Sequence, residues 1–357
     1  MNNKQKIICL IDALGPGGAE RQMVGLATML RDAGYEVQVL YHEPKEFFVN
    51  ELNEKGIKTT YFEGNKSALS KIYKIRRAIQ IFRPDTVIAF LQASSMIASV
   101  IRITGLKFRL IVSERNTNRS KTLRDSIRFN LFRIADYIVP NSYSQADFIQ
   151  KYYGFLQQKV KTIVNFVDTD AFQPKPHERG FEILVAATLW PSKNAIGLIT
   201  ALKLLKDKGV KCHVKWFGKV QDQEDYALKC EDLIEKNGLS DCIELFNKTK
   251  HISEEYQKAD YFCLPSFYEG TPNVICEAMA SGLPILCSDV CDNGRYVQNG
   301  INGFLFDPYN TNDISSAIEK AITASDEIYN HWKENSRRFA IERLSTTKFI
   351  NQYLKLI

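Results

Sequence analysis

The chain has 357 residues, of which 45% are hydrophobic and 25% are charged. This composition is typical of a soluble globular protein and excludes collagen-like, disordered and disulfide-stapled chains, while the length suggests two domains of roughly 150 residues each. The longest stretch without a charged residue, 86–101, contains a glutamine and three serines and is shorter than the ~20 apolar residues that span a bilayer. We therefore expect no membrane-spanning helix. Residues 1–12 resemble a first strand and not a secretory signal, which predicts a cytoplasmic protein.

The cysteines and histidines argue against a metal site. Eight cysteines occur without a CxxC pair, and Cys263, Cys276 and Cys287 lie within apolar runs. Such cysteines are typical of small core residues in a reducing compartment. The five histidines are scattered without HxH or HxxxH spacing. We expect no bound metal.

The net charge of +6 is distributed unevenly. Residues 66–133 hold fifteen Lys or Arg and three acidic residues, a balance of 15 − 3 = +12, which leaves 6 − 12 = −6 for the remainder. A basic block of this kind fits an anionic membrane surface, a polyphosphate substrate or nucleic acid. A solvated face without a partner is the alternative.

Short apolar runs alternate with amphipathic stretches in both halves of the chain, which indicates doubly wound parallel sheets. Expected strands of the first half are 6–14, 36–42, 58–64, 86–91, 109–114, 136–142 and 160–165, and expected helices are 19–33, 69–83, 94–104, 123–133 and 143–152. After a polar, proline-flanked segment, 173–180, the expected strands are 182–188, 213–218, 242–246, 260–266 and 284–289. From about Asp326 the pattern is helical only. The fold class is α/β, with two Rossmann-like halves.

A glycine-rich loop follows the first expected strand. Gly15, Gly17 and Gly18 stand between that strand and a helix, where backbone can approach an anion closely and helix amides can bind it. Glu20 occupies the third glycine position of a GxGxxG fingerprint, and no acidic residue ends the second strand. The pattern therefore disfavours a nicotinamide cofactor, and a plain tight turn is the alternative.

A second loop joins a buried strand to a helix near residue 270. The strand ends at Pro265, the loop carries Glu269, and Thr271 can cap a helix whose first turn begins with Pro272. The amides at this helix start can hold anions and hydroxyl groups.

Further along the same helix, Asn273, Glu277 and Ser281 recur at intervals of four residues. This spacing puts them on one polar stripe. On periodicity alone, such a stripe is more typical of a solvent-exposed face than of a ligand site.

These residues resemble a known family. Glu269 and Glu277, seven residues apart within PSFYEGTPNVICEAMASGLP, look like the paired-glutamate (E-x7-E) motif of the retaining glycosyltransferases of family 4, which have the GT-B fold. The likeness covers nearly the whole chain through the segments GGAER, SERN, NFVDTDAF, SKN, WFG and NGFL.

The resemblance implies a GT-B architecture of two Rossmann-like doubly wound domains that face a cleft. The expected boundaries are an acceptor-binding domain at 1–175, a nucleotide-sugar donor domain at 176–335, and a helix at 336–357 that returns toward the first domain.

It also implies roles for single residues. Glu277 would bind the ribose hydroxyls, and Glu269 with the amides after it would hold the transferred sugar. Lys193 and the glycine loop would meet the diphosphate, because a fixed cation and helix amides stabilise a leaving nucleoside diphosphate. The implied catalytic residues are Glu269, Lys193 and Arg115. The implied donor-binding residues are Gly17, Gly18, Lys193, Gly270, Thr271, Asn273 and Glu277. No metal or other cofactor is required.

The chain departs from the family pattern at two places. Ala187-Thr188-Leu189 stands where many relatives have Gly-Arg-Leu, so one cation is missing. Arg115 stands near the place of a family histidine and can supply that charge, although a structural pairing with Glu114 or with another residue is the alternative.

A different transferase architecture is suggested by the DxD triplet 168–170. DxD binds metal and diphosphate in GT-A enzymes, but here the triplet precedes the inter-domain segment and has no partner histidine. We interpret it as a structural cap.

The expected function is a retaining transfer of a hexose or N-acetylhexosamine from a nucleotide-sugar, with uridine favoured over guanosine. The expected acceptor is a saccharide or a polyprenyl-diphosphate-linked saccharide of surface glycan assembly. The basic block would place the enzyme peripherally on the anionic inner leaflet of the cell membrane, without nucleic acid as a partner. Two alternatives are less suitable. A nucleotide-sugar epimerase would need its own acid–base residues, and the sequence shows no matching set of histidines and carboxylates. A nucleic-acid-binding protein would not need the paired glutamates.

Overall fold

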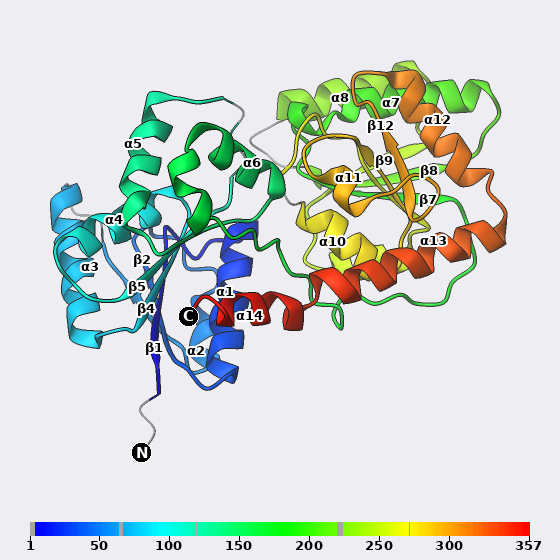
Figure 1. The fold of residues 1–357 in the computed structure, drawn as a ribbon. Coiled ribbons are helices and arrows are strands. Elements are labelled where there is room, and N and C mark those ends of the chain that lie inside the picture. The colour runs from blue at the N-terminus through cyan, green and yellow to red at the C-terminus, as the bar shows by residue number, and fades with distance from the viewer. Residues whose placement is uncertain (1–3, 64–66, 117, 119, 220–223, 271) are drawn as a thin grey trace. The chain divides into compact units, whose positions relative to one another are not determined.

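A computed structural model describes residues 4–63, 67–116, 118, 120–219, 224–270 and 272–357. The chain forms two compact units, each around its own sheet (Figure 1). The N-terminal unit comprises Met1–Asn165 and Thr347–Ile357, and the C-terminal unit comprises Phe166–Thr346. The polar segment 173–180 thus belongs to the C-terminal unit, and the returning segment begins later than residue 336.

The N-terminal unit contains a six-stranded parallel sheet with the order β3-β2-β1-β4-β5-β6. Its strands are β1 Lys6–Ile11, β2 Glu36–Tyr41, β3 Lys58–Tyr61, β4 Thr86–Phe90, β5 Arg109–Glu114 and β6 Tyr137–Pro140. Its helices are α1 Gly18–Asp32, α2 Val49–Glu54, α3 Ala68–Phe82, α4 Gln92–Ile103, α5 Leu123–Leu131 and α6 Tyr143–Tyr152, with α14 Thr346–Leu354 from the end of the chain.

The C-terminal unit contains a second six-stranded parallel sheet with the order β12-β11-β10-β7-β8-β9. Its strands are β7 Glu182–Ala186, β8 His213–Lys219, β9 Ile243–Asn247, β10 Tyr261–Leu264, β11 Ile285–Ser288 and β12 Gly303–Phe306. Its helices are α7 Ala195–Asp207, α8 Glu224–Lys236, α9 Ile252–Lys258, α10 Asn273–Ala280, α11 Asn293–Tyr296, α12 Thr311–Ile322 and α13 Asp326–Phe339.

Both sheets have the strand order of a doubly wound fold, so the predicted α/β class is confirmed. The strand order reverses between β1 and β4 in one unit and between β7 and β10 in the other. Ligands of doubly wound sheets bind at the carboxyl ends of the strands beside such a reversal. A ligand site is therefore expected at the loops after β1, β4, β7 and β10.

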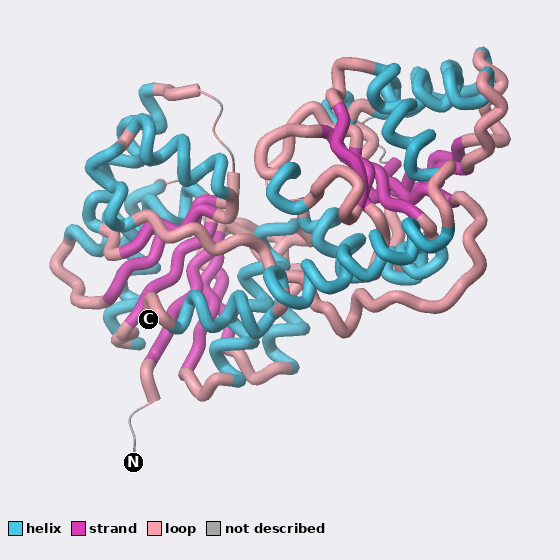
Figure 2. The backbone as a smooth tube through the Cα atoms, turned by 45° about the vertical axis from the view of Figure 1, so that its right-hand side comes forward, coloured by secondary structure: helices cyan, strands magenta, loops and turns pink. Residues whose placement is uncertain are grey.

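Helices cover both faces of each sheet (Figure 2). The strands are therefore apolar, and the amphipathic stretches between them form the covering helices. All five residues of β4 are buried, as is typical of strands in parallel sheets. Helix starts follow the capping residues: the Ser142 hydroxyl accepts a bond from the Gln145 amide at the start of α6, and Thr122 forms a capping box with Asp125 at α5.

Two expected strands differ from the structure. Residues 160–165 do not form a strand, although Val160 makes an isolated bridge to Ile138 of β6 and the Ile163 amide donates to the Pro140 carbonyl at 3.1 Å. The Lys161 amide donates to the Ile138 carbonyl, but Pro140 has no N–H with which to continue the ladder. Conversely, β12 was not among the predicted strands. Gly303 begins it with φ 151°, and a Cβ there would lie 1.8 Å from the Ile285 carbonyl oxygen.

The end of the chain is held in both units. In the C-terminal unit, the Arg337 guanidinium of α13 donates to the carbonyls of Thr169, Phe172 and Ala280 at 2.9, 2.8 and 2.5 Å. In the N-terminal unit, Tyr353 is fully buried and Arg109 donates to the carbonyls of the last two residues. Among the described residues, no helix combines the length and the apolar character that a membrane span requires.

Candidate functional site

The loops after β7 and β10 are joined by two contacts at the carboxyl end of the C-terminal sheet. Lys193 Nζ donates to Glu269 Oε1 at 2.5 Å, and the Phe267 amide donates to the Ser192 carbonyl at 3.0 Å. The Lys193 side chain is 24% exposed and that of Glu269 is 10% exposed. The structure therefore brings these two predicted residues together as a partly buried ion pair.

Local backbone geometry explains the residues that surround Lys193. Asn194 adopts a left-handed conformation with φ 57°, which asparagine tolerates better than most residues. Its side chain accepts a bond from the Gly197 amide at the start of α7 and donates to the Pro308 carbonyl at 2.8 Å. Asn194 thus fixes the turn that presents Lys193.

The loop that contains Thr188, in place of the family arginine, packs directly against β8. The Leu189 amide donates to the Gly218 carbonyl at 2.9 Å, and Trp216 Nε1 donates to the Ala187 carbonyl at 2.8 Å. A Cβ on Gly218 would lie 1.9 Å from the Ala187 oxygen. The glycine is therefore required for the loop with Thr188 to approach the strand.

Helix α10 carries the other predicted donor residues. It begins at Asn273 with Pro272 as its N-cap, one residue later than predicted, and Thr271 lies outside the described residues. Gly270 and Asn273 are half-buried at the helix start. The helix start thus presents backbone amides beside the loop that holds Glu269.

Glu277 is buried, and the interpretation of its stripe as solvent-exposed is wrong. Glu277 is only 6% exposed, and Ser281 is 2% exposed. Tyr256 of α9 donates its hydroxyl to Glu277 Oε2 at 3.2 Å. A buried carboxylate needs hydrogen-bond donors. Tyr256 supplies one, and the hydroxyl groups of a ligand can supply others.

In the N-terminal unit, the glycine loop lies between β1 and α1 as predicted. Gly17 is the N-cap of α1, and Gly18 is its first residue. A Cβ on Gly17 would lie 2.1 Å from Glu20 Oε2, so the Glu20 side chain folds back over the loop. Burial raises the pKa of Glu20 despite a backbone hydrogen bond that lowers it.

Arg115 follows β5 and is 9% exposed. Its guanidinium lies 4.3 Å from the centroid of the Phe90 ring. Within the described residues, none of its three side-chain nitrogens has a hydrogen-bond partner. Burial lowers the pKa of Arg115, and the nearby Tyr353 offsets only part of that effect. Glu114 pairs instead with Arg128 Nη1 at 3.2 Å, so the alternative pairing of Arg115 with Glu114 is wrong.

A polar cluster at the carboxyl ends of β1, β2 and β4 escaped the sequence analysis. Asp12 Oδ1 accepts bonds from the Ser94 amide and hydroxyl at 2.9 and 2.6 Å, and it lies 3.4 Å from His42 Nε2. Lys71 Nζ lies 3.4 Å from His42 Nδ1. Hydrogen bonds from His42 and Ser94 lower the pKa of Asp12 even though burial alone would raise it. The available signal was position, since Asp12 and His42 each directly follow a strand.

The DxD triplet has a structural role, as predicted. Asp168 Oδ1 accepts hydrogen bonds from the amides of Asp170 and Ala171, both at 3.0 Å. This carboxylate therefore caps a turn. Metal independence remains a prediction.

The structure thus distributes the predicted residues over both units. Lys193, Glu269, Gly270, Asn273 and Glu277 lie in the C-terminal unit on two joined loops and α10. Gly17, Gly18 and Arg115 lie in the N-terminal unit at the carboxyl end of its sheet, and Thr271 lies outside the described residues.

Two family models match the chain in succession. The model "Glycosyltransferase Family 4" matches residues 16–171, and the model "Glycosyl transferases group 1" matches residues 167–339. Together they extend over parts of both units and over every site residue that the sequence predicted.

Individual proteins are similar over almost the full length. The GalNAc-alpha-(1->4)-GalNAc-alpha-(1->3)-diNAcBac-PP-undecaprenol alpha-1,4-N-acetyl-D-galactosaminyltransferase of Campylobacter jejuni is 25% identical, over 99% of this chain and 98% of its own. An uncharacterized glycosyltransferase of Haemophilus influenzae is 25% identical, over 90% of this chain and 91% of its own. The crystal structure of Anabaena HepE in complex with UDP has a TM-score of 0.88 at 20% identity, covering 98% of this chain and 99% of that chain. This last likeness shows a shared fold.

Proposed function

Because the chain belongs to the family 4 glycosyltransferases of the GT-B fold, we propose that it transfers a hexose or N-acetylhexosamine from a UDP-sugar with retention at the anomeric carbon. The observation that carries the donor assignment is the buried Glu277 on α10, next to the loop whose Glu269 pairs with Lys193. Buried carboxylates that face a ligand are suited to hydroxyl donors, and the ribose of a nucleotide supplies two of them.

In this proposal Lys193 balances charge on the diphosphate. Its pairing with Glu269 holds the ammonium group in place before any ligand arrives. When the sugar leaves, negative charge develops on the diphosphate, and a cation already in position stabilises it without reorganisation. Glu269 and the amides at the start of α10 then contact the sugar.

Arg115 supplies a second cation in the proposal. A buried guanidinium without a partner is unfavourable. An anionic ligand that binds it is favoured, because the guanidinium has already lost its hydration in the free protein. The diphosphate of the donor or of a lipid-linked acceptor has the required charge. This assignment compensates for Thr188, which stands in place of the family arginine.

The proposed acceptor is a saccharide linked to a polyprenyl diphosphate. The support is the Campylobacter relative, whose name specifies an undecaprenol-linked substrate. The exposed face of α3 adds physical support, because it combines Leu69, Tyr73 and Ile81 with Arg77. Apolar and basic side chains together favour an anionic bilayer surface, so we assign the enzyme to the inner leaflet as a peripheral protein.

A thermal-shift panel of nucleoside diphosphates tests the donor assignment. A ligand that binds only the folded chain raises the midpoint of unfolding according to its affinity. UDP is expected to raise the midpoint most. A larger shift with GDP would replace uridine by guanosine, and no shift with any nucleoside diphosphate would contradict the proposed donor site.

A further inference from the structure

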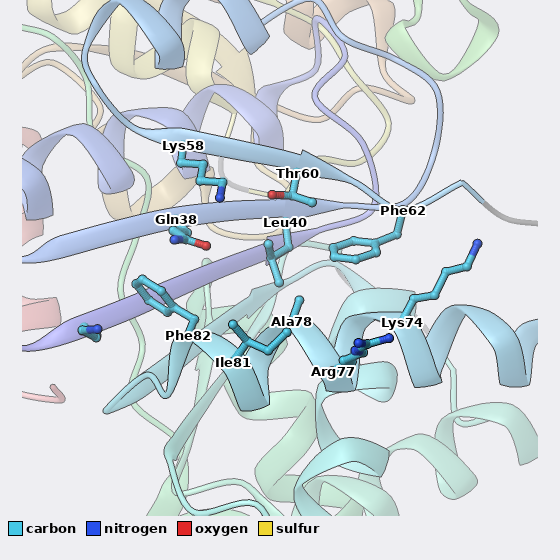
Figure 3. A pocket seen from close by; sticks show the side chains of 11 residues that line it. Gln38, Leu40, Lys58, Thr60, Phe62, Lys74, Arg77, Ala78, Ile81 and Phe82 are labelled. Carbon is cyan, nitrogen blue, oxygen red and sulfur yellow. The ribbon is translucent and has the colours of Figure 1, made fainter.

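A groove lies in the N-terminal unit between α3 and the face of strands β2 and β3 (Figure 3). Its volume is about 510 Å³. In register, Gln38 pairs with Lys58 and Leu40 with Thr60, so these four side chains lie on one face of β2 and β3. Because β3 is the edge strand, α3 covers that face only in part.

The floor of the groove is apolar. Leu40 and Phe62 point into it from the sheet side, and Ala78, Ile81 and Phe82 approach from α3 (Figure 3). Leu40 and Phe82 are 1% and 8% exposed at the bottom of the groove, whereas Ile81 is 73% exposed at its side. The groove therefore offers apolar surface that an apolar chain can cover.

The rim of the groove is basic. Lys6, Lys58, Lys74 and Arg77 line it, and none of the described residues that line it is acidic. Lys6 lies 3.7 Å from Glu36, whereas within the described part of the chain no ion pair is found for the other three. The three cations for which no ion pair is found, together with the apolar floor, are complementary to a ligand that is anionic and apolar at once.

From this complementarity we infer that the groove binds one acidic phospholipid of the membrane, with an acyl chain over the apolar floor and the phosphate on the basic rim. The position of the cations separates this lipid from the acceptor. Lys6 and Lys58 are the first residues of β1 and β3, so they mark the amino end of the sheet. The glycine loop and Arg115 lie at the opposite, carboxyl end.

The inference builds on the proposed membrane attachment but adds a specific lipid site to it. Surface attraction alone requires no groove and binds any acidic vesicle. A lipid site also binds single lipid molecules in solution, and this difference can be measured.

The experiment is methyl NMR on the full chain with isoleucine side chains labelled. Dihexanoylphosphatidylglycerol is titrated below its micelle concentration, with dihexanoylphosphatidylcholine as the uncharged control lipid. The Ile81 methyl resonance is expected to shift saturably with the acidic lipid, whereas Ile103, another exposed isoleucine at the end of α4, is expected not to shift. Equal shifts with both lipids, or no saturation at Ile81, would overturn the inference.

Charge variants make the test specific to the groove. Lys74→Glu with Arg77→Glu is expected to weaken binding about 30-fold, since each cation beside an anionic lipid contributes about 1 kcal/mol. Lys107→Glu with Arg124→Glu reverses the same number of charges at two exposed positions outside the groove and is expected to leave affinity unchanged. Equal loss in both variants would show general charge attraction only.

Two further titrations identify the source of the ligand. Tighter binding of farnesyl diphosphate at Ile81 would assign the groove to the polyprenyl acceptor and overturn the phospholipid. UDP is titrated into the same wild-type sample, so a chain that binds UDP but no lipid refutes the groove and leaves the proposed donor site intact.

Discussion

Replacement of Glu277 by glutamine is the sharpest perturbation of the proposed donor site. Glutamine has the same shape and can still accept the hydroxyl bond from Tyr256, so the fold should persist. The carboxylate charge is lost. Hydrogen bonds to charged groups contribute about 1.5–3 kcal/mol, against about 0.5–1.5 kcal/mol for neutral ones. For two ribose hydroxyls, the loss is about 2 kcal/mol, which weakens UDP binding roughly 30-fold.

Calorimetric titration of UDP measures this change, with Glu235→Gln on α8 as the matched control. Glu235 is exposed in the same unit, so its replacement removes one charge without touching the site. A comparison with 2′,3′-dideoxy-UDP isolates the ribose contact, because wild type should discriminate between the two ligands and Glu277→Gln should discriminate far less. Equal discrimination by both proteins would refute the assignment of Glu277 to the ribose.

Three more perturbations follow from the same structure. Lys193→Ala is expected to lower turnover about 100-fold, measured as sugar transfer or donor hydrolysis, and near wild-type turnover would assign the role to another cation. Arg115→Met should raise the thermal midpoint, because it removes a buried unpaired charge, while it lowers activity; a less stable variant would contradict that account. Burial raises the pKa of Glu114 from 4.5 to about 7, although Arg128 opposes the shift. A raised carboxyl pKa means that stability falls as pH rises from 4.5 to 7, so the advantage of Glu114→Gln over wild type in urea unfolding should grow between pH 5 and 8. A constant difference would show that Glu114 does not titrate there.

The sheets were predictable because each strand carries its own local pattern. The segment 160–165 has the same apolar pattern as a strand, yet it forms no strand. The reason lies in the neighbouring strand β6, where Pro140 has no N–H to donate to the ladder. In the opposite case, the two central residues of β12 are only half-buried, so the strand lacks the continuous buried run that marks β10 and β11. Its backbone approach at Gly303 depends on β11.

The candidate site shows a similar division. Resemblance to the family identified Lys193 and Glu269, and the structure pairs them. Periodicity gave the opposite expectation for the burial of Glu277, because it cannot show that Tyr256 packs over the helix. The bond between Asp12 and Ser94 joins residues 82 positions apart, so only the folded sheet brings them together.

The central claim is that the chain uses a UDP-sugar with retention, and donor hydrolysis followed by proton NMR tests both parts at once. Enzyme at high concentration is mixed with an α-linked UDP-sugar without acceptor, and the anomeric signals are recorded before the free sugar mutarotates. We predict release of UDP together with initial formation of the α-anomer, both about 100-fold slower in Lys193→Ala. Initial formation of the β-anomer would contradict retention, and turnover of GDP-sugars in place of UDP-sugars would contradict the donor.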